Sequence, residues 1–166
     1  MKKATKASDN KYYIARYNAA RTNPNFESRE AASEVLGIDR TRLARIELGN
    51  VEPYPEEVLL MSKHYNTPEL TYNFCSNDCP IGRLTMKEVE ISSFDRLSLK
   101  ILGSLNDIEQ LRGSIINISA DGKVDIEELE EFKAILSSLE DISNNAKALQ
   151  LWAMKNIQNT NNLPAK

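Results

Sequence analysis

Arginine residues at positions 29, 40, 42 and 45 lie in a context suited to DNA. An arginine can donate two hydrogen bonds to guanine, the methyl group of a threonine can contact thymine, and a small alanine permits close approach to the bases. Arg29 could also reach a backbone phosphate or a flanking base. The predicted DNA-binding residues are Arg29, Asp39, Arg40, Thr41, Arg42, Ala44 and Arg45. The alternative interpretation is that these arginines only keep a surface helix soluble.

Two short helices are predicted to position these side chains. Ser28 and Asp39 are suited to accept hydrogen bonds from the free N–H groups at a helix N-terminus. Gly37 and Gly49 can adopt the left-handed conformation that ends a helix. The residues predicted to face inward are Ala32, Val35, Leu36, Ile38, Leu43 and Ile46. Two short helices joined by a tight turn that contains glycine form a helix-turn-helix motif.

This segment resembles the lambda-repressor/Cro-like family of helix-turn-helix regulators. The matching residues are Ser28, Glu30, Leu36, Gly37, Leu43, Ile46, Glu47, Gly49 and Pro53. The resemblance implies a five-helix DNA-binding domain over residues 11–72, and an ion pair between Arg21 and Glu47. The sequence departs from the family at Arg29, where a glutamine is usual, and in a loop at 22–27 that is one residue longer.

The second half of the chain is predicted to form a long helical hairpin over residues 85–157. Apolar residues recur at steps of three and four from Phe94 to Ile118 and again from Ile126 to Ala153. A turn at 120–123 separates the two stripes, so the helices should be antiparallel neighbours. Because two helices bury little apolar surface, we expect two copies to pair as a coiled-coil-like homodimer. The alternative is that the hairpin packs on its own N-terminal domain.

No alternating pattern long enough for a strand is present, so the fold class is predicted to be all-α. A flexible tail (1–10) precedes the DNA-binding domain. A connector (73–84) joins that domain to the hairpin, and a polar tail (158–166) ends the chain.

Two cysteines, Cys75 and Cys79, fall in the connector. They could be small buried thiols, half of a metal or cluster site shared across a dimer, or a redox-sensing disulfide. Asp78 and His64 lie nearby in the sequence, but a structural zinc usually needs four ligands. No metal and no cofactor are therefore predicted.

The segment 117–128 resembles a calcium loop of the EF-hand type. Its candidate ligands are Asn117, Ser119, Asp121, Asp125 and Glu128. A plain turn at Asp121-Gly122, with Asp125 capping the next helix, explains the same residues without metal. His64 is the chain's single histidine and has no nucleophile in a recognisable context, so the protein is not expected to be an enzyme.

The chain of 166 residues carries a formal net charge of −3, which is unusual for a protein that binds DNA. Residues 1–72 contain 11 basic and 10 acidic side chains, and residues 73–166 contain 10 and 14, so the acidity belongs to the second half. There is no apolar segment for a membrane helix or a signal peptide, and the protein is expected in the cytoplasm.

These observations predict a sequence-specific transcriptional regulator, a dimeric repressor whose operator in double-stranded DNA has two half-sites. The alternative is a protein-interaction module, similar to an antirepressor or an antitoxin, whose helix-turn-helix binds a protein partner.

Overall fold

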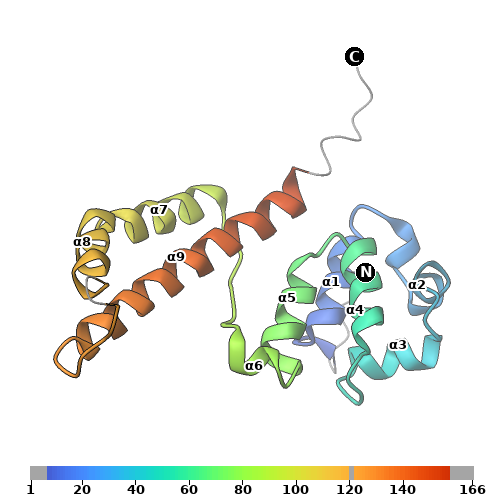
Figure 1. The fold of residues 1–166 in the computed structure, drawn as a ribbon. Coiled ribbons are helices and arrows are strands. Elements are labelled where there is room, and N and C mark those ends of the chain that lie inside the picture. The colour runs from blue at the N-terminus through green and yellow to red at the C-terminus, as the bar shows by residue number, and fades with distance from the viewer. Residues whose placement is uncertain (1–6, 120–121, 158–166) are drawn as a thin grey trace. The chain divides into compact units, whose positions relative to one another are not determined.

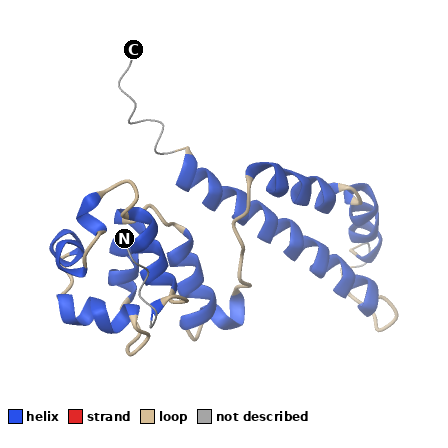
Figure 2. Ribbon diagram, turned by 180° about the vertical axis from the view of Figure 1, so that it is seen from behind, coloured by secondary structure: helices blue, strands red, loops and turns tan. Residues whose placement is uncertain are grey.

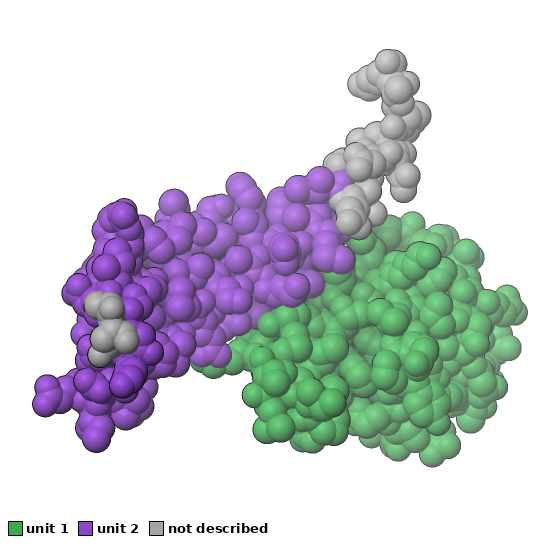
Figure 3. Space-filling view, in the orientation of Figure 1, with its two compact units in different colours: residues 1–88 green, residues 89–166 purple. Residues whose placement is uncertain are grey.

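The computed structural model describes residues 7–119 and 122–157, and these residues form helices and no strand (Figure 2). The all-α fold class is thereby confirmed. The chain divides into two compact units, unit 1 at residues 1–88 and unit 2 at residues 89–166 (Figure 3). The predicted polar tail at 158–166 lies outside the described residues.

Unit 1 is a series of short helices joined by tight turns (Figure 1). Its helices are α1 (Lys11–Ala19), the 3₁₀ helix η2 (Pro24–Phe26), α2 (Arg29–Leu36), α3 (Arg40–Glu47), α4 (Pro55–His64), α5 (Glu69–Asn73), the π-helix η3 (Phe74–Asp78) and α6 (Gly82–Thr85). Helical structure thus continues beyond residue 72. The predicted connector at 73–84 is part of unit 1, because the Asp78 carboxylate accepts hydrogen bonds from Lys11 Nζ at 2.7 Å and Tyr12 Oη at 3.2 Å.

The residues predicted to begin and end the two helices of the helix-turn-helix are confirmed. Ser28 Oγ accepts a hydrogen bond from the N–H of Ala31 at 3.1 Å, and Asp39 Oδ1 accepts one from the N–H of Arg42 at 2.9 Å. Gly37 ends α2 with φ +66°, and Gly49 follows α3 with φ +72°. These two positions demand a left-handed backbone, which glycine adopts without steric cost.

The core of unit 1 lies where these helices meet. Its largest fully buried side chains include Phe26, Leu43, Ile46 and Met61, and the Phe26 ring packs edge-on against Tyr65 at 5.1 Å between centroids. All the predicted inward residues of the motif are buried except Val35, which is 36% exposed. The prediction for Val35 was wrong because the turn of helix that buries Ala32 and Leu36 directs Val35 away from the core.

Residues 7–10 are ordered parts of unit 1 rather than a flexible tail. Ala7 is buried, and Asn10 caps α1 by accepting hydrogen bonds from the N–H groups of Tyr12 and Tyr13. Asn10 also donates from Nδ2 to the carbonyl of Ile46 at 3.0 Å, which ties the start of α1 to α3. Residues 1–6 lie outside the described part of the chain.

Unit 2 consists of α7 (Phe94–Leu105), α8 (Ile108–Ile118) and α9 (Leu129–Asn156), with α7 and α8 packed on α9 (Figure 1). Phe94 at the start of α7 contacts Trp152 near the end of α9 at 4.9 Å between rings, and Asn145 Nδ2 donates to the carbonyl of Lys100 at 3.4 Å, so these two helices run antiparallel. The hairpin does not begin at residue 85, because residues 86–93 form no helix. None of the described helices is long and apolar enough to cross a membrane.

The first helix predicted for unit 2 is two helices, separated at Asn106 and Asp107. Short polar side chains of this kind compete for backbone hydrogen bonds and favour turns over helix interiors. The apolar periodicity continues across the break, and the chain changes direction there.

Candidate nucleic-acid interface

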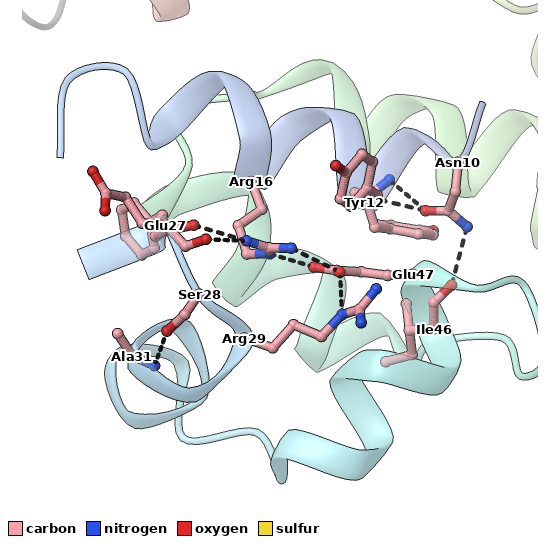
Figure 4. A network of polar contacts seen from close by, with 11 residues as sticks. Asn10, Tyr12, Arg16, Glu27, Ser28, Arg29, Ala31, Ile46 and Glu47 are labelled. Atoms are coloured by element: carbon pink, nitrogen blue, oxygen red, sulfur yellow. Dashed lines mark hydrogen bonds and ion pairs between the residues drawn. The ribbon is translucent and has the colours of Figure 1, made fainter. Parts of the chain in front are cut away.

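A buried carboxylate at the end of α3 contacts one of the predicted DNA-binding residues, Arg29. Glu47 is fully buried and forms a two-point ion pair with Arg16 of α1, from Nε to Oε1 at 2.5 Å and from Nη2 to Oε2 at 3.0 Å (Figure 4). Arg29 at the start of α2 adds a third hydrogen bond, from Nε to Oε2 at 2.7 Å. One carboxylate therefore joins α1, α2 and α3.

Arg16, not Arg21, is the partner of Glu47. Helix α1 ends at Ala19, so Arg21 lies beyond it, exposed, with its guanidinium over the ring of Tyr17 at 5.8 Å. Arg16 lies inside α1 and is 3% exposed. The predicted pair between Arg21 and Glu47 was therefore wrong, because a side chain that reaches the buried Glu47 must lie on the buried face of α1.

Arg16 also fixes the loop before the motif. Its Nη1 donates to the carbonyl of Phe26 at 2.8 Å. Burial disfavours the charge of Arg16, but its hydrogen bonds to Glu47 outweigh this and keep its pKa above the ordinary value. Arg16 thus links α1 both to the end of α3 and to the loop that precedes α2.

Arg29 and Arg42 are both already engaged within unit 1. Arg29 Nε donates to Glu47, and the Arg29 side chain is 29% exposed. Arg42 forms a two-point ion pair with Glu57 of α4, with its Nη2 at 2.7 Å from Oε2, and stacks over Tyr54 at 4.1 Å. Arg42 therefore does not point freely outward as predicted, because it links α3 to the start of α4.

The exposed side of α3 carries the other predicted residues. Arg40, Thr41 and Arg45 are exposed, Ala44 is half-buried between them, and the capping residue Asp39 is exposed beside them. Arg40 forms a surface ion pair with Glu30 at 2.7 Å. Within the part of the chain that the structure describes, Arg45 forms no ion pair. The structure thus brings Asp39, Arg40, Thr41, Ala44 and Arg45 together.

The contact between Glu57 and Arg42 should make unit 1 sensitive to acid. Partial burial disfavours the charge of Glu57, but hydrogen bonds from Arg42 and from the N–H of Tyr54 outweigh it and hold the pKa of this carboxyl below its ordinary value. A carboxyl whose pKa is lower in the folded chain stabilises the fold above its unfolded pKa, and that stability is lost as the pH falls through the folded pKa.

We therefore expect Glu57→Gln to lower the urea midpoint of unit 1 at neutral pH, with the difference from wild type shrinking below about pH 4. Near-ultraviolet circular dichroism of the tyrosines measures this, since all six lie in unit 1. Glu56→Gln, at the exposed neighbouring position, is the control. An equal effect of both substitutions at every pH would contradict the prediction.

The remaining candidates do not form a site in the structure. Cys75 is exposed and Cys79 is half-buried, and both are free thiols. The interpretation that both are small buried thiols is therefore wrong for Cys75. His64 is exposed on α4. Across residues 7–119 and 122–157, no group of three or more His, Cys, Asp or Glu side chains could hold a metal ion.

The predicted calcium loop lies partly outside the described residues, since Asp121 is among those left out. Gly122 has φ +75°, as a tight turn requires. Asp125 does not cap the following helix, because α9 begins only at Leu129 and the N–H of Asp125 instead donates to Glu128 Oε2 at 3.1 Å.

Comparison of the chain with models of protein families, with curated proteins and with solved structures finds no match.

Proposed function

We propose that this protein is a sequence-specific regulator of transcription that binds double-stranded DNA through α3. The observation that carries the proposal is the exposed set Arg40, Thr41, Ala44 and Arg45 on a helix whose orientation the buried Glu47 fixes. A rigid helix with arginine, threonine and alanine on its exposed side suits the major groove. The resemblance of residues 28–49 to repressor motifs supports the same proposal.

In this proposal each predicted residue has a distinct role. Arg45 reads a base, since no carboxylate in the described residues holds it. Arg40 reads a base after leaving Glu30, because an ion pair this exposed contributes little to stability. Arg29 binds a phosphate with the accessible part of its guanidinium. Arg42 positions α3 and does not read sequence.

The regulator is proposed to act as a homodimeric repressor in which unit 2 pairs two copies. Support comes from the large apolar side chains that unit 2 leaves exposed, among them Leu102 at 61% and Leu136 at 50%. Surface of this kind favours association. A symmetric dimer would bind two half-sites separated by about one helical turn of DNA, ~34 Å, or a multiple of it.

Selection from random DNA followed by sequencing tests the proposal. We expect a two-fold symmetric consensus, and binding to it should weaken steeply with salt because phosphate contacts release counterions. Selection of no preferred sequence would instead favour the protein-interaction module. An affinity for the consensus that does not change with salt would also count against DNA contacts by these arginines.

A further inference from the structure

Helix α9 carries an apolar stripe on a face that α7 does not cover. α7 packs on the face with Asn145 and Trp152, since Asn145 Nδ2 donates to the carbonyl of Lys100 at 3.4 Å and the Trp152 ring lies 4.9 Å from that of Phe94. Leu129, Leu136 and Leu139 on another face are 43%, 50% and 43% exposed. The same alternating steps of three and four continue along the whole helix, through the polar Ser143 and Gln150 and through Phe132, which is half-buried beside Ile118 of α8. The members of the stripe are Leu129, Phe132, Leu136, Leu139, Ser143, Ala146, Gln150, Ala153 and Ile157. This is the heptad spacing of a coiled-coil seam.

We propose that the occupant of this stripe is α9 of a second copy, running antiparallel, with the two-fold axis near residues 143–146. The inference rests on the homodimer of the proposed function and specifies its surface and orientation. The two small residues, Ser143 and Ala146, lie at the middle of the stripe and would let the helices approach closely. Each Leu136 then packs against Ala153 of the second copy, so that a large side chain faces a small one.

The two edges of the stripe determine the orientation. One edge is apolar, with the half-buried Ile142 and Leu149, and the other is polar, with Glu140 and Lys147. In an antiparallel pair each edge meets the same edge of the other copy, so apolar residues face apolar residues and Glu140 faces Lys147 twice. A parallel pair would place the polar edge against the apolar one and desolvate its charges, which is unfavourable.

Charge reversal in the full chain tests the orientation. Sedimentation equilibrium should show that Glu140→Lys weakens the dimer roughly tenfold, since it replaces two attractive contacts with two repulsive ones. The double substitution Glu140→Lys with Lys147→Glu should restore the affinity to within about twofold. Because residues 140 and 147 of one chain are about 10 Å apart along the helix, rescue reports a contact between copies.

A second measurement separates orientation from association. A spin label at Lys133→Cys, with Cys75 and Cys79 changed to serine, should give a separation of roughly 30–35 Å in the antiparallel dimer, from the helical rise of 1.5 Å per residue. A parallel dimer would bring the labels to about 10–20 Å, set by the distance between neighbouring helices and the label arms. The short separation, or a double reversal without rescue, would overturn the proposal.

The surface itself is tested with a matched pair of leucines. Leu139→Asp should abolish dimerisation, whereas Leu99→Asp should not, because Leu99 is 70% exposed and lies about 200° around α7 from the buried Leu97. Equal effects of the two substitutions on dimerisation, or a wild type that stays monomeric, would overturn the proposal.

Selection of bound DNA separates this inference from the proposed function. Antiparallel dimers that select no sequence would refute the proposed function alone, and monomers that select one would refute this inference alone.

Discussion

Glu47→Ala is expected to destabilise unit 1 by about 3–5 kcal/mol, which is typical for removing one partner of a buried ion pair. The substitution leaves the 3%-exposed Arg16 charged without its carboxylate. It also removes the hydrogen bond of Arg29 and leaves a small cavity. A loss of this size approaches the whole stability of an ordinary domain, so unit 1 of this variant should be largely unfolded at moderate temperature.

The full chain allows this effect to be assigned to one unit. All six tyrosines lie in unit 1, and the single tryptophan, Trp152, lies in unit 2. Urea unfolding followed by the tyrosine near-ultraviolet signal should shift strongly, while the transition seen by tryptophan fluorescence should not. Glu30→Ala removes a carboxylate that is paired with Arg40 at the surface, and should have little effect. A shift no larger than that of Glu30→Ala would show that the Glu47 network does not stabilise the fold.

The helix boundaries around the motif could be predicted because they depend on near neighbours. Ser28 and Asp39 each accept a hydrogen bond from a backbone N–H three residues later. Gly37 ends α2 through its own positive φ, which depends on no distant residue. Such interactions are local, so residue type and spacing determine them. The burial of Leu43 and Ile46 follows from the same helical period.

The partners of the arginines could not be predicted, because they lie far away in the sequence. Arg16 meets Glu47 across 31 positions, and Arg42 meets Glu57 across 15. Each contact depends on where a helix ends and how it is rotated against the core. Of the predicted DNA-binding arginines, Arg29 and Arg42 are engaged by Glu47 and Glu57 in this way, which local sequence patterns could not predict.

The apolar stripes of unit 2 were predicted, but not which surfaces they would cover. Periodicity identifies an amphipathic helix and does not identify its neighbour. The stripe of α9 that should have met the other half of the hairpin is partly exposed at Leu136 and Leu139, while α7 packs beside Asn145 and Trp152. An Asn-Asp pair at 106–107 was the available signal for the helix break, and apolar periodicity obscured it.

Arg45→Ala is expected to weaken binding to the selected operator by about a hundredfold or more. One bidentate contact between arginine and a base discriminates by about 1–3 kcal/mol, and a dimer loses two such contacts. The fold should be unchanged, because among the described residues no carboxylate pairs with Arg45. Fluorescence anisotropy with the selected operator and with scrambled DNA measures the effect. The loss should be confined to the operator, since the sequence-independent affinity comes from phosphate contacts.

Two matched substitutions separate base reading from charge. Arg21→Ala removes one exposed cation outside α3 and should lower the affinity for both DNAs slightly and equally. Arg45→Lys keeps the charge but lacks the fork geometry for two parallel hydrogen bonds, so it should recover the affinity for scrambled DNA and only part of that for the operator.

Because Arg42 is held by Glu57 and Tyr54, Arg42→Ala should lower stability as well as binding, whereas Arg45→Ala should lower binding alone. Operator affinity of Arg45→Ala equal to that of Arg21→Ala would show that α3 does not read the bases through this residue.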